Sequence, residues 1–424
     1  MSLVDLRRLL PRLDVEVLAN GLTVAVLNAP RRPVVATALV YRAGARDDAP
    51  GHGGTAHYLE HMMFKGSQNY AAGEIDRTTM ALGGSNNAFT SHDLTLYYFT
   101  FAADRWHRAL AIEGDRMAGL LLEEDEVRSE RQVILEEIAM YESEPWDVLD
   151  HNVSKSFYGA HPYGRPILGS RDELRATGAQ ELAAFHQRYY RPENAILVLA
   201  GAVGDDAVAR AADSFAALER NGGPPQRAVA PEAEPPAPVH RLERRAGELA
   251  RFLFSMPAPA ATDPEHAPLR LLLNVLGSGR ASRLHRALVD EGQLCVGVSA
   301  DLTEGLDPGS VSFALEVLPG IEAARVEEAL FAELEKLRTT PPDIAEVERA
   351  KKILIADWTF DHEKVYQQAF LTATSMALFD AEHPWRYLET LLTTTPADLP
   401  PLIERYLQPR RGVLGWSLPA TQEP

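Results

Sequence analysis

A proline-rich segment near the middle of the chain constrains the fold more than any other feature. Residues 221–240, NGGPPQRAVAPEAEPPAPVH, contain six prolines and almost no large apolar side chains. Proline lacks a backbone N–H donor and favours extended chain, so this composition is typical of a linker. The segment therefore predicts two domains, residues 1–220 and 241–424. The total of 424 residues, which is long for one ordinary domain, agrees with this division.

The two halves of the chain share an order of elements. In the first half, helical patterns at residues 55–65 and 73–82 precede a strand-like alternation at 94–102 and a helix at 104–119. In the second half, helical patterns at 269–277 and 282–292 precede strand-like runs at 295–300 and 309–317 and a helix at 321–337. This repetition predicts an α+β fold of two related domains, each a mixed β-sheet covered by helices on one face.

Composition limits the kinds of partner and of site. The net charge of −18 argues against nucleic acid and against an anionic membrane surface as partners. A single cysteine, Cys295, excludes an intrachain disulfide and a thiolate metal cage, so any metal site must use His, Asp and Glu. The N-terminus shows no apolar signal region and no run of 18 apolar residues occurs, so we expect a soluble cytoplasmic or periplasmic protein.

Two histidines and a glutamate lie within five positions, in the order His57-x-x-Glu60-His61. On a helix over residues 55–65, the histidines lie one turn apart on one face, where both imidazoles can bind the same metal ion. Glu60 lies at the edge of this face, within reach of a water molecule on such a metal. An exposed polar face on an ordinary amphipathic helix is the alternative interpretation.

A catalytic zinc site usually has three protein ligands, so a third ligand must come from elsewhere in the chain. The helical pattern around ERQVILEEIAMYE places one stripe of side chains inward: Val127, Glu130, Ile134, Glu137, Ile138 and Tyr141. An inward carboxylate is costly unless it is paired, and a metal ion held by histidines would pair it. The periodicity favours Glu137 over Glu136 as the ligand. Alternatively, Glu130 and Glu137 flank the core and reach solvent.

These residues together resemble the inverted zinc motif of the M16 metallopeptidases, the pitrilysin and insulinase family, in which HxxEH is followed by a distant glutamate. Glu137 follows His61 by 76 residues, and the surrounding segments LEHMMFKGS, GGSNNAFTSHDLTLYY and SERQVILEEI match as well. The resemblance covers most of the first half, and the second half resembles the matching domain more loosely. The length indicates the short, M16B-type class, whose two-domain chains pair to enclose a chamber.

The resemblance implies a Zn2+ site and a peptidase activity. By this resemblance His57, His61 and Glu137 bind the zinc ion, and Glu60 is the general base that activates water. The implied substrates are unfolded peptides, whose identity and cleavage specificity the sequence does not indicate.

Two further sets of residues acquire roles from the same resemblance. Glu130 matches a second glutamate of the catalytic motif, with a role in orienting a ligand histidine. A substrate-binding edge strand near the zinc matches four residues, Asn87, Ala88, Phe89 and Thr90. Such a strand holds an extended peptide through main-chain hydrogen bonds. An ordinary strand edge is the alternative interpretation of this segment.

The second half departs from the family pattern at one point. Active members usually carry an arginine and a tyrosine, seven residues apart, that bind substrate and stabilise the oxyanion. Val289 and Val296 occupy these positions, and neither side chain can donate a hydrogen bond. We therefore expect this chain to carry the zinc half of a site that an M16-type partner subunit with the Arg/Tyr pair completes, as a heterodimer. A non-catalytic scaffold or peptide-binding subunit and a self-sufficient homodimer stay open as alternatives.

Overall fold

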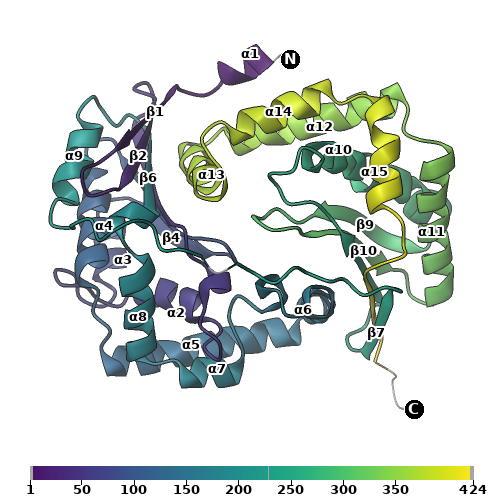
Figure 1. Ribbon diagram of the computed structural model, residues 1–424, viewed down its shortest axis with the longest axis horizontal. Helices are drawn as coiled ribbons and strands as arrows, with labels where there is room; N and C mark the ends of the chain where they lie inside the picture. The colour runs from purple at the N-terminus through teal and green to yellow at the C-terminus, as the bar shows by residue number, and fades with distance from the viewer. Residues whose placement is uncertain (1–2, 228, 421–424) are drawn as a thin grey trace. The chain divides into compact units, whose positions relative to one another are not determined.

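The computed structural model describes residues 3–227 and 229–420, which form two compact units (Figure 1). The first unit comprises Met1–Ile138, Pro166–Val229 and Thr359–His383, and the second comprises Ala139–Arg165, Ala230–Trp358 and Pro384–Pro424. The change between residues 229 and 230 falls inside the proline-rich segment. Each unit also includes a segment from the other half of the chain, Thr359–His383 in the first unit and Ala139–Arg165 in the second. The contiguous domains 1–220 and 241–424 assign these segments differently.

The first unit is built on a six-stranded mixed sheet. Its strand order is β1 (Leu13–Val17), β2 (Thr23–Asn28), β6 (Ala195–Gly201), β3 (Val34–Tyr41), β5 (Thr95–Ala102) and β4 (Ser85–Thr90). β2 and β6 run parallel, and the other neighbours are antiparallel. β4 is therefore an edge strand, bonded within the sheet to β5 alone.

Helices cover both faces of this sheet, because successive side chains of a central strand point to opposite faces and both sets are apolar. One face packs on α2 (Thr55–Met62), α3 (Glu74–Ala81), α4 (His107–Gly119), α5 (Glu124–Ser143), α7 (Arg171–Ala176), α8 (Ala179–Tyr189) and α9 (Ala207–Ser214). The other face packs on α13 (Val365–Leu378), as Figure 1 shows. Short elements complete the unit: α1 (Leu3–Arg7), η1 (Ala45–Asp47) and η3 (Pro192–Asn194).

Small side chains explain why α13 lies against the sheet. Several alanines of the sheet, including Ala36 and Ala38 of β3, face the helix. They pack against Ala369 and Ala373 of α13. All four are fully buried. Alanine on both surfaces allows close approach of the two backbones, so a helix from the distant second half of the sequence completes the first core.

The second unit is built on a five-stranded sheet in the order β7 (His240–Arg245), β11 (Val413–Leu418), β8 (Arg251–Pro257), β10 (Ser310–Val317) and β9 (Cys295–Leu302). One face packs on α10 (His266–Gly277), η4 (His285–Glu291), α11 (Ala323–Thr339), α12 (Ile344–Asp361), α14 (His383–Thr393) and α15 (Leu399–Tyr406). The other face packs on α6 (Pro145–Tyr158). Two short 3-10 helices are η2 (Pro162–Gly164) and η5 (Pro396–Asp398).

The predicted α+β class with two sheets covered by helices is confirmed, and the structure adds one helix on the second face of each sheet. The helical pattern at residues 282–292 forms a π-helix, η4, rather than an ordinary α-helix. Within residues 3–227 and 229–420, no helix has the length and apolar character needed to span a membrane.

Candidate functional site

Helix α2 presents the two histidines. It begins after Gly54, which adopts a left-handed conformation (φ 88°). The carboxylate of Asp48 accepts the backbone N–H groups of Gly54 and Ala56 at 2.7 and 2.9 Å, which satisfies donors that the first helical turn leaves free. His57 and His61 follow on one face, with ring centroids 4.6 Å apart.

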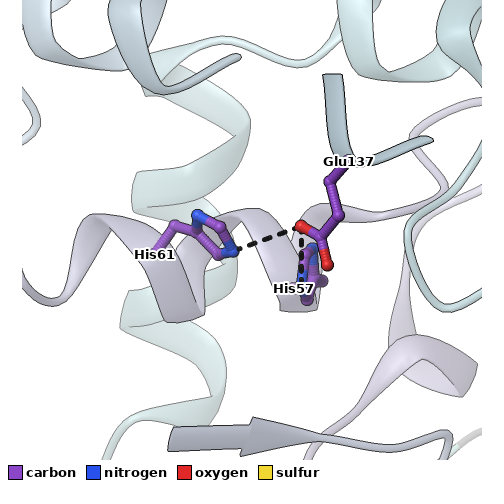
Figure 2. Close-up of side chains that lie close together, drawn as sticks. All are labelled: His57, His61 and Glu137. Atoms are coloured by element: carbon purple, nitrogen blue, oxygen red, sulfur yellow. Dashed lines mark ion pairs between the residues drawn. The ribbon is translucent and has the colours of Figure 1, made fainter. Parts of the chain in front are cut away.

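Helix α5 brings the third candidate ligand to these rings. The Oε2 atom of Glu137 lies 3.8 Å from Nε2 of His57 and 3.7 Å from Nε2 of His61 (Figure 2). One ligand atom from each of the three residues lies within 4.8 Å of the other two. Glu136 is exposed on the same helix and does not join the group. Two imidazoles and one carboxylate around a common point form a donor set that suits a zinc ion.

The inward stripe predicted for α5 is present except at its end. Val127, Glu130, Ile134 and Ile138 are buried, and Glu137 is half-buried beside the histidines. Tyr141, predicted to point inward, is instead 48% exposed. The helical period specifies which side chains share a face, but it does not specify how far along the helix the core extends.

Glu130 connects the second histidine to a lysine. Its Oε1 atom lies 2.8 Å from Nδ1 of His61, and its Oε2 atom lies 2.6 Å from Nζ of Lys65. Burial works to raise the pKa of Glu130, but the hydrogen bonds from His61 and Lys65 outweigh it and lower the pKa below its usual value. An ionised Glu130 accepts a hydrogen bond from the Nδ1 proton of His61, so in the neutral ring the lone pair is on Nε2, the atom that lies 3.7 Å from Glu137.

Glu60 lies in a drier setting at the edge of the same group. Burial raises its pKa above the usual range, while a hydrogen bond from the Thr90 hydroxyl to Oε2 opposes this shift. His61 and Glu137 also influence the pKa of Glu60 electrostatically, with opposite signs. A carboxylate with a raised pKa close to a metal centre is suited to accept and return a proton near neutral pH.

Strand β4 places the segment Asn87 to Thr90 at the open edge of the first sheet. The N–H of Ala88 donates to Oδ1 of Asn87 at 2.9 Å, rather than to β5. In an antiparallel pair, alternate residues direct their main-chain groups away from the partner strand, so Ala88 belongs to the outward set. The segment therefore offers main-chain donors and acceptors to an added strand. Phe89 is 46% exposed, and its ring packs on Phe370 of α13.

A cluster of charged side chains connects η1 to the turn between β4 and β5. The backbone N–H of Arg46 donates to the carbonyl of His92 at 3.0 Å, and its guanidinium forms a buried ion pair with Asp93 at 2.7 Å. Arg227, from the proline-rich segment, donates to the carbonyl of Asp93. Sequence reasoning missed this cluster, Lys65 and the cap at Asp48. Only Asp48 had a local signal, an aspartate just before a glycine-rich helix start.

The positions aligned with the missing Arg/Tyr pair lie in the second unit. Val289, on η4, is half-buried against the second core, and Val296, on edge strand β9, is 53% exposed. The nearby Arg283 is occupied by a bidentate pair with Glu346, at 2.8 and 2.7 Å. It is therefore held on the surface of its own unit by a carboxylate.

The fold and this site are those of a metallopeptidase, and comparison with known proteins identifies its family. Residues 23–171 match the family model "Insulinase (Peptidase family M16)", and residues 178–354 match "Peptidase M16 inactive domain". The chain belongs to the M16 peptidase family. The family predicted from the sequence motifs is thus confirmed.

Several relatives show how far the likeness extends. The chain is 27% identical to the zinc protease PqqE of Helicobacter pylori, over 94% of this chain and 91% of that one. It is 30% identical to an uncharacterized zinc protease of Mycobacterium leprae, over 72% and 68%. It is 32% identical to an uncharacterized zinc protease of Streptomyces coelicolor, where the match covers 66% of this chain and 62% of the relative.

Solved structures agree with this assignment. The crystal structure of a protease from Helicobacter pylori superposes with a TM-score of 0.90 at 26% identity, covering 97% of this chain and 100% of that chain. An M16-like peptidase from Alicyclobacillus acidocaldarius superposes with a TM-score of 0.87 at 22% identity, covering 96% and 98%, and shows the same fold.

Proposed function

We propose that this chain is a zinc metalloendopeptidase subunit in which His57, His61 and Glu137 hold the zinc ion. The observation that carries the proposal is the convergence of their three ligand atoms within 4.8 Å, with the Nε2 atoms of both histidines facing the carboxylate. The zinc protease names of the relatives support the same metal. When bound, zinc lowers the pKa of a water ligand to about 7 and polarises the scissile carbonyl.

Residues of the chain perform the proton transfers. Glu60 accepts a proton from the attacking water and returns it to the leaving amine, a role that its raised pKa favours. The hydroxyl of Thr90 donates to one carboxylate oxygen of Glu60, which leaves the other oxygen to face the water. Glu130 holds the His61 ring in orientation through Nδ1. These contacts preorganise the base and one ligand before substrate arrives.

The substrate in this proposal is an extended peptide that pairs with β4. The outward main-chain groups of β4 supply hydrogen bonds that do not depend on the peptide sequence. Thr90 lies on this same strand and touches the proposed base, so a paired peptide lies beside Glu60. A folded protein has few free extended segments to offer, which restricts the proposed substrates to unstructured peptides.

We further propose that a second M16-type subunit completes the site. Val289 and Val296 stand where the family usually has an arginine and a tyrosine, and their side chains supply no donor to a developing oxyanion. Loss of one such donor typically costs about 10²–10³ in rate. The isolated chain should therefore bind zinc but turn over slowly.

The ligand assignment is tested by elemental analysis of variants purified without chelator. We expect about one zinc per chain, lost in His57→Ala, His61→Ala and Glu137→Gln. Glu136→Gln is the matched control on the same helix and should retain its zinc, because Glu136 lies outside the ligand group. Zinc loss in Glu136→Gln with full retention in Glu137→Gln would contradict the assignment.

The divided site is tested by cleavage of an unstructured peptide of about 20 residues. The zinc-loaded chain alone should be at least about 10²-fold slower than its mixture with an M16-type chain that carries the Arg/Tyr pair. Removing that arginine or tyrosine from the added chain should silence the mixture. Full activity of this chain alone, at equal zinc content, would refute the divided site and favour a self-sufficient homodimer.

A further inference from the structure

A pocket of about 420 Å³ lies in the second unit, between α6 and the edge strand β7. Helix α6 contributes Leu149, Asn152, Lys155 and Ser156, and β7 contributes Leu242 and Arg244. None of the proposed metal ligands lines it, and all of its lining residues belong to the second unit. Its volume is within the usual range for pockets that hold a small ligand.

Among the described residues, Lys155 and Arg244 line this pocket without a carboxylate partner, whereas Arg241 and Arg245 of β7 each have one. In the described part of the chain, no ion pair or side-chain hydrogen bond engages Lys155 or Arg244, and Nη1 of Arg244 is buried without a partner. By contrast, Arg241 of the same strand is held by Glu327 at 2.6 Å. Arg244 as a whole is half-buried, and this nitrogen is a free donor that an anion in the pocket can accept.

The acidic lining residue does not fill this role. Oε1 of Glu243 lies 3.8 Å from Nη2 of Arg245, so Glu243 pairs with Arg245 and not with Arg244. On a chain with a net charge of −18, two unneutralised cations around one pocket are a local departure from the overall charge. A carboxylate suits them, because a planar guanidinium binds a carboxylate with two hydrogen bonds.

The remaining lining specifies what the carboxylate is attached to. Leu149 is buried and Leu242 is half-buried, so the floor of the pocket is apolar. β7 pairs with β11 alone in the described sheet, so its other main-chain edge is open to an extended chain. An apolar side chain, a terminal carboxylate and an extended backbone occur together at the C-terminus of a peptide.

We propose that this pocket binds the C-terminal residue of a peptide whose last side chain is apolar. The side chain packs on Leu149 and Leu242, and the terminal carboxylate binds Arg244 and Lys155. The site is separate from the metal centre and does not depend on the proposed catalysis. In addition to β4, it gives the chain a second peptide-binding site, which recognises the C-terminal residue.

The test measures peptide binding by calorimetry, using the full chain with Glu60→Gln so that no probe is cleaved. The probe is an acetylated tetrapeptide, three alanines followed by leucine, as its free acid and as its C-terminal amide. We expect the acid to bind at least about tenfold more tightly than the amide. Arg244→Gln should reduce binding of the acid to the level of the amide, and Lys155→Gln should reduce it severalfold.

Arg241→Gln is the matched control, because Arg241 lies on the same strand, is paired with Glu327 and does not line the pocket. It should leave binding of the acid unchanged. Lys155 is exposed on a helix, so Lys155→Gln tests the site even if Arg244→Gln unfolds, which thermal unfolding will reveal. Equal binding of acid and amide, or an unchanged affinity in both pocket variants, would overturn the proposal. Binding of hexanoate as tight as that of the peptide would overturn the peptide assignment.

Discussion

Glu130 offers a sharp test of how the chain supports its metal centre. Its side chain is 7% exposed and holds both Nδ1 of His61 and Nζ of Lys65. Glu130→Gln preserves size and an acceptor oxygen but removes the charge. A hydrogen bond to a charged group contributes about 1.5–3 kcal/mol and a neutral one about 1 kcal/mol. The weakened bond to His61 should therefore cost about 0.5–2 kcal/mol of metal binding.

The ammonium of Lys65 adds to this loss, because without Glu130 its charge repels a nearby dication. Removing groups that orient metal ligands typically lowers affinity by about 10–100-fold, and the contacts of Glu130 predict a loss in that range. Competition with a chromogenic zinc chelator measures the affinity directly. Lys65→Met combined with Glu130→Gln should recover part of it, since the repelling cation is then absent.

Glu136→Gln is the control for this measurement, because it removes the same charge from an exposed position of the same helix. Its zinc affinity should equal that of the unaltered chain. An affinity of Glu130→Gln within twofold of this control would show that Glu130 does not support the ligand, and the reasoning from its two contacts would fail.

Three further predictions concern catalysis, packing and pH. Glu60→Gln should keep its zinc and lose about 10²–10⁴ in kcat on an unstructured peptide, and a loss below tenfold would exclude Glu60 as the base. Gly415→Ala should lower the free energy of unfolding by about 1–3 kcal/mol in denaturant titration, because its Cβ would lie 2.6 Å from Cγ2 of Val153, whereas Gly297→Ala meets no atom within 4 Å and should change it little. Burial lowers the pKa of His186 to about 4, so its contribution to stability is present above the unfolded value of about 6.5 and is lost as pH falls from there toward 4. His186→Gln should show a shallower fall in Tm between pH 6.5 and 4.5, and equal slopes would contradict this.

The geometry of the candidate site follows from the sequence wherever one helix determines it. The i, i+4 spacing puts His57 and His61 on one face of α2, and the helical period of α5 separates Glu137 from Glu136. Periodicity could not reveal the ion pairs that Lys65 forms at the site and Arg46 forms beside it. Their partners, Glu130 and Asp93, lie in distant segments, and a single sequence does not show which surface charges meet.

The positions of α6 and α13, each of which packs in the unit formed mainly by the other half of the chain, could not be predicted for a different reason. Both sheets need apolar cover on their second face, and α6 and α13 supply apolar side chains to it. Their destination depends on surface shape: α13 matches a face lined with alanine, and α6 approaches β11 where Gly415 has no side chain. Shape complementarity of this kind appears only when the whole sheet is assembled.

Because α6 and α13 pack in this way, the proline-rich segment does not separate the two units cleanly. A cut between residues 229 and 230 would separate α13 from the first unit and α6 from the second. Ala36 and Ala38, both fully buried under α13, would then face water together with the other apolar residues of that surface. Exposing a contiguous apolar face of a sheet favours association over folding. The proline-rich segment therefore contains only one of the points at which the chain passes from one unit to the other.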